Sequence, residues 1–193
     1  ESDYDQANIL NNYAVRNLAE ISKSDQILLI HISTDYVYDG NIENGCYDED
    51  SPCNPLSVYG ITKFAGDMSI INSGCNYIIL RTSWVYSEYG KNFVKTISDL
   101  GKKRDEISVI NDQKGSPTCA KDIAVALQKI ILKYKKNDLQ HGLYNFTGNE
   151  TMSWYDFAKI IFKESNGIGI KTPGIVKPIS TEEYPLPANR PKN

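Results

Sequence analysis

The sequence predicts an α/β protein built around a parallel sheet. Two continuous apolar runs of strand length, Gln26–Ser33 and Tyr77–Thr82, have the composition of strands buried on both faces, which is typical of parallel sheets. Segments with helical periodicity precede, separate and follow these runs, and this alternation favours a layered α/β domain. With 193 residues the chain can bury a sizeable core, as one domain or as one domain with a small second lobe.

Composition and motif content argue against several functional classes. The net charge of −3 gives no general electrostatic reason to bind nucleic acid, and no apolar run approaches the roughly 18 residues that span a membrane. Four cysteines fall at no metal-type or redox-type spacing, and the two histidines, His31 and His141, lie too far apart in sequence to suggest a metal site. We therefore expect reduced thiols, structural histidines and a cytoplasmic protein.

The first half of the chain is expected to fold as helix, strand, loop, helix and strand. A helix over Asp3–Ser22, with Ser2 as its N-cap, repeats apolar residues at three- and four-residue spacing: Leu10, Ala14, Leu18 and Ile21. After the first strand, the connection 34–57 is rich in Asp, Gly, Asn and Pro, and connections of this length are usually functional or mobile. The next helix runs over Val58–Asn72, and Gly74 is a natural C-terminal stop.

The second half adds three helices and short strands. The helices are expected over Asn92–Lys103, over Lys121–Lys135 and from Ser153 to about Ser165. In the second of these, the residues expected to face inward are Ile123, Ala124, Leu127, Ile130 and Ile131. The expected strands are Ile107–Ile110 and Gly142–Thr147, and from residue 167 onward the chain is expected to form strand and loop.

One pair of side chains, Tyr59 and Lys63, suggests a role in carbonyl chemistry. Tyr59 and Lys63 are four residues apart, so a helix places them on one face, where the ammonium would stabilise a phenolate and draw the pKa of Tyr59 down toward neutrality. The spacing alone is a weak signal, because a half-buried tyrosine beside a solvated lysine is common on helices. However, the preceding strand ends at Thr34, and parallel sheets bind ligands at the carboxyl ends of their strands. Thr34 would orient a carbonyl oxygen, Tyr59 would protonate it, and Lys63 would tune Tyr59 and hold a ribose hydroxyl.

Six segments carry a family resemblance, and they follow one another in the family's order: Ser33–Gly40, Pro55–Asp67, Arg81–Tyr86, Asn92–Thr96, Val109–Thr118 and Pro187–Asn193. On these segments the sequence resembles the extended short-chain dehydrogenase/reductases, and within them the reductases of 4-keto nucleotide sugars. Epimerase and dehydratase relatives share Tyr-x-x-x-Lys but lack the Arg-Thr-Ser-Trp-Val-Tyr and Asn-Asp-Gln-x-Gly-x-Pro-Thr segments.

The resemblance implies a Rossmann-like sheet, incomplete at the N-terminus, over residues 1–82 and 120–147, with a smaller substrate-binding lobe over 83–119 and 148–193. It implies hydride transfer from NADPH, with NADH as the alternative, to C4 of dTDP-4-dehydro-6-deoxy-L-mannose, which gives dTDP-L-rhamnose. The implied partner is a small-molecule nucleotide sugar, a homodimer is left open, and the implied setting is the bacterial cytoplasm.

The resemblance also implies roles at the site. Thr34, Tyr59 and Lys63 match the catalytic group, and Tyr59 and Lys63 also contact the cofactor. Thr34 and Asp35 match contacts to the sugar, and Trp84 matches an aromatic residue that packs on the sugar ring.

Three further positions gain a role from the resemblance. Gln113 and Arg190 would otherwise be read as surface residues, and they become substrate contacts; a guanidinium suits the diphosphate of dTDP because it binds two oxygens at once. Asn11 lies where the superfamily often keeps an asparagine that supports the lysine through water.

Other readings stay open. Trp84 follows a buried strand and would ordinarily be a core residue, and the acidic run 48–50 reads as a solvated loop. Two rival functions are a non-catalytic reductase-like binding or regulatory subunit and a related nucleotide-sugar epimerase or dehydratase. The presence of Thr34, Tyr59 and Lys63 argues against a non-catalytic subunit, because such a protein need not keep these residues.

Departures from the family pattern set further expectations. No Gly-rich phosphate-binding turn of the G-x-G-x-x-G kind occurs in the chain, so we expect an internal fragment that by itself shows little cofactor binding and no turnover. A carboxylate that some members use in a metal site between subunits is replaced by Lys121, so we expect no metal.

Overall fold

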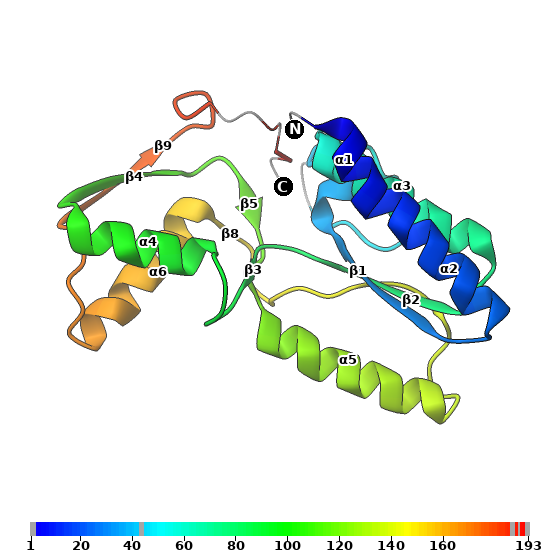
Figure 1. Ribbon diagram of the computed structural model, residues 1–193. Helices are drawn as coiled ribbons and strands as arrows, with labels where there is room; N and C mark the ends of the chain where they lie inside the picture. Colours follow the sequence, from blue (N-terminus) through cyan, green and yellow to red (C-terminus); the bar gives the residue numbers. More distant parts are fainter. Residues whose placement is uncertain (1–2, 43–44, 186–187, 189, 192–193) are drawn as a thin grey trace.

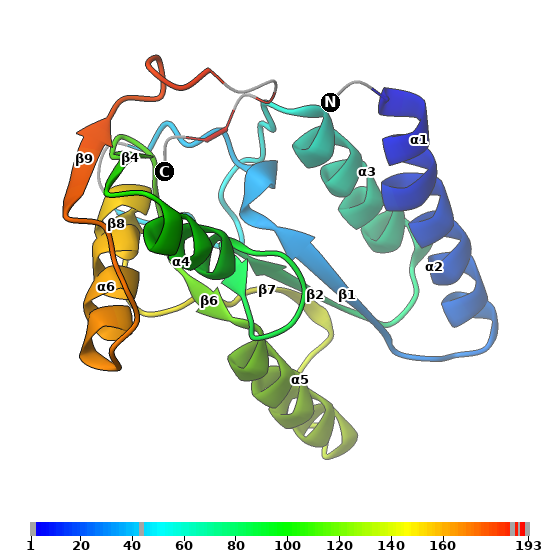
Figure 2. The same ribbon diagram turned by 60° about the vertical axis from the view of Figure 1, so that its left-hand side comes forward.

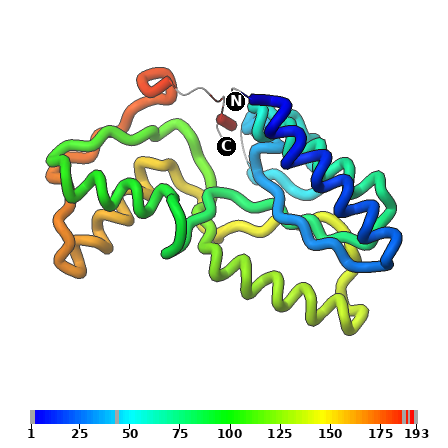
Figure 3. Tube along the Cα trace, in the orientation of Figure 1, coloured from blue at the N-terminus to red at the C-terminus, as the bar shows by residue number. Residues whose placement is uncertain are grey.

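Two groups of secondary-structure elements make up the fold, and the chain passes repeatedly from one group to the other (Figures 1 and 3). The computed structural model describes residues 3–42, 45–185, 188 and 190–191. The first group holds a three-stranded parallel sheet, so the predicted fold class is confirmed.

This sheet is built from β1 (Leu29–Thr34), β2 (Tyr77–Thr82) and β7 (Gly142–Asn145), in the order β1-β2-β7. The register places Thr34 beside Thr82 at the carboxyl ends of β1 and β2. β2 is the central strand and is buried along almost its whole length, as its apolar sequence predicts. The prediction of a fully buried strand was wrong for β1, in which only Ser33 and Thr34 are buried, because β1 lies at the edge of this sheet.

Helices cover this sheet on both sides (Figures 1 and 2). On one side lie α1 (Tyr4–Asn8), a π-helical turn (Ile9–Tyr13), α2 (Ala14–Ser24) and α3 (Val58–Ser73). α3 is the predicted second helix: the Ser57 hydroxyl accepts a hydrogen bond from the Gly60 N–H at its start, and Gly74 ends it with φ +73°.

The first helix forms as predicted, but two details differ. Ser2 lies outside the described residues, and the N-cap is Asp3, whose carboxylate accepts from the Gln6 N–H at 3.0 Å. The apolar stripe of Leu10, Ala14, Leu18 and Ile21 faces outward, and the residues that pack against α3 and the sheet are Val15 and Ala19.

On the opposite side of the sheet lies α5 (Ala120–Lys135). Of its five predicted inward residues, Ile123 is buried and Leu127 and Ile130 are partly buried. Ala124 and Ile131 are exposed, so the prediction was wrong for these two. Among the described residues, no helix is both long enough and apolar enough to cross a membrane.

The second group has its own core. α4 (Phe93–Lys103) and α6 (Trp154–Gly167) pack on β4 (Glu106–Ile110), which pairs in parallel with β9 (Ile175–Ile179). Its buried residues, including Ile97, Ile107 and Phe162, form a cluster separate from the one between α2, α3 and the sheet. Two short strand pairs complete the fold: β3 (Val85–Tyr86) with β6 (Thr118–Cys119), and β5 (Lys114–Gly115) with β8 (Met152–Ser153).

Candidate active site

A cavity of about 930 Å³ opens where the two groups of elements meet. Its wall combines the carboxyl end of β1 and the start of α3 with residues of α4, β4, α6 and the tail. Five predicted site residues line it: Thr34, Asp35, Tyr59, Trp84 and Arg190. A volume of this size lies in the range of small-molecule sites, which usually combine apolar walls with a few polar groups.

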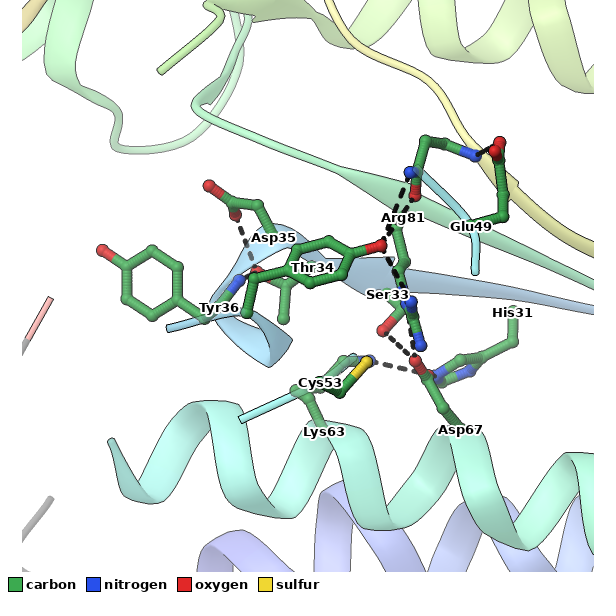
Figure 4. Close-up of polar contacts among 12 residues, drawn as sticks. His31, Ser33, Thr34, Asp35, Tyr36, Glu49, Cys53, Lys63, Asp67 and Arg81 are labelled. Atoms are coloured by element: carbon green, nitrogen blue, oxygen red, sulfur yellow. Dashed lines mark hydrogen bonds and ion pairs between the residues drawn. The ribbon is translucent and has the colours of Figure 1, made fainter. Parts of the chain in front are cut away.

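The end of β1 positions the first two of these side chains. A short 3₁₀ turn (Asp35–Val37) follows the strand, and the Thr34 hydroxyl caps it by accepting from the Tyr36 N–H at 3.2 Å. The same hydroxyl donates to Asp35 Oδ1 at 3.1 Å (Figure 4). Burial raises the pKa of Asp35 to about 6, against the lowering effect of its hydrogen bonds with Thr34 and the backbone. Asp35 therefore changes its charge near neutral pH, beside the Thr34 hydroxyl.

The first turn of α3 brings Tyr59 to the same wall. Its ring meets Tyr36 edge to face, with centroids 5.6 Å apart. Burial raises the pKa of Tyr59, the negative charges of Asp35 and Asp67 raise it further, and the Thr34 hydroxyl opposes them. The expected lowering of this pKa by Lys63 is not found, because the Lys63 ammonium is directed toward β1: it donates to the Ile32 carbonyl at 2.8 Å and lies 3.0 Å from His31 Nε2.

Behind Lys63 lies a buried ionic cluster (Figure 4). Asp67, one turn further along α3, is fully buried, and its Oδ2 accepts from Ser33 Oγ at 2.9 Å and from Arg81 Nε at 3.2 Å. Arg81 also donates to the Tyr38 hydroxyl at 2.9 Å. The cluster ties β1, β2 and α3 together, and its member Ser33 also lines the cavity.

Trp84 forms the aromatic side of the cavity together with Trp154. The two indoles stack with centroids 3.4 Å apart and planes 6° apart, and Phe93 packs on Trp154 at 4.5 Å. Gly115 also lies against Trp84, since a Cβ built there would be 2.4 Å from Trp84 Cε2. Trp84 itself has φ +46°, a conformation that is strained for a bulky residue. The indole proposed to pack on a sugar is thus held by neighbours on more than one side.

The remaining predicted site residues lie elsewhere. Gln113 is buried and donates to Thr181 Oγ1 at 3.0 Å, so the structure places it against the tail and not on the cavity wall. Asn11 lies in the π-helical turn and donates to Thr62 Oγ1 at 3.0 Å. Lys63 does not line the cavity, and its ammonium donates to the carbonyl of Ile32 in β1.

Sequence reasoning missed two residues of this region. Trp154 directly follows the helix cap Ser153, and nothing in the residue pattern marks it as a cavity residue. The position of His31 could have been predicted, because it lies two residues from Ser33 in the same strand. Side chains two residues apart in a strand point to the same face, here the face of β1 that α3 covers. The sequence reading treated it as a structural histidine.

All four cysteines are free thiols, and only Cys75 is buried.

Comparison with known proteins identifies relatives over the whole chain. The RmlD substrate binding domain family matches residues 1–193. The dTDP-4-dehydrorhamnose reductases of Aggregatibacter actinomycetemcomitans and Sinorhizobium fredii are 40% and 42% identical, with all of this chain covered and 66% and 65% of theirs. The chain therefore spans somewhat less than two thirds of the length of these relatives.

Solved structures agree with this assignment. The dTDP-4-dehydrorhamnose reductase of Bacillus anthracis, solved in complex with NADP, superposes with a TM-score of 0.90 at 42% identity, over all of this chain and 64% of that one. The corresponding enzyme of Clostridium acetobutylicum gives 0.88 at 41% identity, with the same coverage. The chain belongs to the RmlD substrate binding domain family.

Proposed function

We propose that this chain forms the sugar-nucleotide site and the proton-donating side of an NADPH-dependent dTDP-4-dehydrorhamnose reductase. The reaction is reduction of the C4 keto group of dTDP-4-dehydro-6-deoxy-L-mannose to dTDP-L-rhamnose. The observation that carries the proposal is the convergence of Thr34, Tyr59, Trp84 and Arg190 on one cavity, in a chain whose relatives bear that name.

The residues of the chain can stabilise the reduction at the carbonyl oxygen. Thr34 and Tyr59 present hydroxyl groups to one oxygen, and Tyr59 gives up its proton as negative charge develops there. The raised pKa of Tyr59 keeps this proton in place until then. We assign Lys63, one turn further along α3, to support the phenolate that remains, although its ammonium is here directed toward β1.

The hydride comes from NADPH when this cofactor is bound, with NADH as the alternative. Tyr59 and Lys63 are the residues of this chain that would contact its nicotinamide ribose. Among the described residues two acceptors hold this ammonium, so one of its three N–H groups is available for a ribose hydroxyl.

The other assignments follow from the cavity. Asp35 and Trp84 would contact the sugar and Arg190 the diphosphate, whereas Gln113 would act indirectly by fixing the tail at Thr181. We propose the division into a Rossmann-like part (1–82 and 120–147) and a substrate lobe (83–119 and 148–193), which the two separate hydrophobic clusters support. The cytoplasmic setting and the homodimer that the resemblance leaves open belong to the same proposal.

The proposal is tested by Tyr59→Phe in the natural full-length protein that contains these residues. We expect NADPH oxidation to require the 4-keto sugar nucleotide, and the variant to lose about 10²- to 10⁴-fold in kcat, the usual contribution of a positioned acid. KM for the sugar nucleotide should change little, because the ring of Phe fills the same place.

Two results would contradict the proposal. Sugar-dependent NADPH oxidation that survives in Tyr59→Phe would remove Tyr59 as the acid. Wild-type protein that binds the sugar nucleotide without turnover would favour a binding or regulatory subunit, and turnover without net NADPH use would favour an epimerase or dehydratase.

A further inference from the structure

The lysine of the proposed catalytic group is held by a histidine that no sequence motif includes. The Lys63 ammonium can donate three hydrogen bonds, and two of them go to acceptors on β1: the Ile32 carbonyl at 2.8 Å and His31 Nε2 at 3.0 Å. An ammonium has no lone pair, so His31 must accept, and its ring must be neutral with its proton on Nδ1.

The carboxylate of Asp67, which also lies near His31, is an alternative partner for the Lys63 ammonium. Asp67 is fully buried, and its Oδ1 has no hydrogen-bond partner among the residues that the structure describes. Lys63 and Asp67 are four residues apart on α3, the spacing at which a lysine and a carboxylate on one helix readily meet. A buried carboxylate oxygen without a donor is energetically unfavourable, and an ion pair with Lys63 would relieve it.

His31 lies close to both groups. Its Nε2 is 3.0 Å from Lys63 Nζ and 3.8 Å from Asp67 Oδ1. We propose that neutral His31 is a positioning residue that holds the Lys63 ammonium off Asp67 and so keeps it at the carboxyl end of β1, below the active-site hydroxyls. The part of this inference that concerns catalysis rests on the proposed function, whereas the part that concerns the contact does not.

The electrostatics of the cluster agree with a neutral ring. The charged groups that face His31 are Lys63 and Asp67 from α3, with Arg81 of β2 behind Asp67. Burial lowers the pKa of His31 to about 4, and the positive charge of Lys63 acts in the same direction. Below that pH a protonated ring would repel Lys63 and would no longer accept its hydrogen bond.

The contact itself can be tested by ¹⁵N NMR of histidine side chains in the natural full-length protein that contains these residues. The signals of His31 are assigned as those that disappear in His31→Gln. We expect Nε2 of His31 to be unprotonated at pH 7, with a pKa near 4 that rises in Lys63→Met because the neighbouring cation is gone. A proton on Nε2 at pH 7, or a His31 pKa that Lys63→Met leaves unchanged, would overturn the inference.

The positioning role is tested by turnover of the natural full-length protein that contains these residues. His31→Gln keeps an acceptor oxygen but cannot titrate, so we expect kcat to stay within about 3-fold and any acid limb near pH 4 to disappear. His31→Ala removes the acceptor and releases Lys63 to Asp67, so kcat should fall about 10²-fold, the scale of a misplaced catalytic group. KM for the sugar nucleotide should stay within about 3-fold in both variants, because His31 does not line the cavity.

A double variant separates positioning from a merely structural role. In His31→Ala/Asp67→Asn the competing anion is gone, so part of the lost kcat should return, although the contact of Asp67 with Arg81 is weakened. Equal losses in His31→Gln and His31→Ala, or a further loss in the double variant, would overturn the positioning role. If the wild type fails to reduce the 4-keto sugar while the NMR results hold, the proposed function fails and the His31 contact stands.

Discussion

At the scale of single residues, two partly buried groups near the cavity are expected to shape the pH dependence of stability in opposite ways. Burial raises the pKa of Asp35 from 3.8 to about 6, so the stability that Asp35 contributes is full below pH 3.8 and is lost as the pH rises through 6. Burial lowers the pKa of His31 from 6.5 to about 4, so its contribution is full above pH 6.5 and is lost as the pH falls toward 4. Each shift corresponds to about 3 kcal/mol, and the two largely cancel between pH 7 and pH 4.

Replacing Asp35 or His31 one at a time should reveal the effect of the other on the pH dependence of stability. Relative to wild type, Asp35→Asn should be more stable at pH 7 and lose that advantage, up to about 3 kcal/mol, by pH 4. His31→Gln should move in the opposite direction, gaining stability relative to wild type as the pH falls over the same range. Urea unfolding at pH 4, 5, 6 and 7 measures both differences. Changes of the same sign in the two variants would contradict the assigned shifts.

The residue scale also shows what sequence could and could not predict. The placement of Tyr59 and of the strand end at Thr34 in one site was predictable, because helix and strand periodicity put both at one edge of the sheet. The direction of the Lys63 ammonium was not readable, because it depends on a histidine in another element and on a buried carboxylate. The raised pKa of Tyr59 follows from burial and from two aspartates, which no local spacing reveals.

At the scale of elements, the π-helical turn between α1 and α2 depends on a close approach to α3. A Cβ at Gly66 would lie 2.1 Å from the Asn11 carbonyl oxygen, so α3 can pack against the turn only where it carries no side chain. Asn11 adds a hydrogen bond to Thr62 at the same contact. A single π turn of this kind inserts one residue into an otherwise regular helix and is frequent at functional sites.

Gly66→Ala should therefore lower the free energy of unfolding by about 1–3 kcal/mol, the usual cost of overpacking, despite the better helix propensity of alanine. Gly167→Ala is the matched control, because a Cβ at this helical position has no heavy atom within 4 Å. We expect that substitution to be neutral or slightly stabilising. Chemical denaturation followed by circular dichroism compares the two, and equal effects would show that the contact at Asn11 is unimportant.

The elements themselves were largely predictable, whereas their packed faces were less so. β2, α3 and α4 form within a residue or two of the expected bounds, because capping residues and continuous apolar runs mark them locally. The outward stripe on the first helix and the exposed Ala124 and Ile131 of α5 were not foreseen. Periodicity shows that a helix has an apolar face, but which neighbour covers that face is decided by tertiary structure.

At the scale of the whole molecule, the cavity requires both groups of elements. β1 and α3 provide the hydroxyls, α6 provides Trp154, the residue after α4 is Arg104, and the tail provides Arg190. Arg190 of the tail interacts electrostatically with Tyr36 of the first group: burial raises the pKa of Tyr36, and the positive charge of Arg190 lowers it. A ligand that carries both a sugar and a diphosphate would contact both groups at once, and its binding should stabilise the whole chain against unfolding.

Because these contacts lie within residues 1–193, the chain alone should bind dTDP-L-rhamnose without a nicotinamide cofactor. The two tryptophans of the sequence, Trp84 and Trp154, both line the cavity, so tryptophan emission should report this binding directly. Arg190→Gln should weaken binding by about 10-fold or more, because a guanidinium–diphosphate contact is charge-assisted, and it should also reduce the salt dependence of Kd. Lys129→Gln, a charge change on the exposed side of α5, is the control. If Arg190→Gln binds as tightly as wild type, or if thymidine binds as tightly as dTDP-L-rhamnose, the diphosphate does not lie at Arg190, and the nucleotide must be placed elsewhere in the cavity.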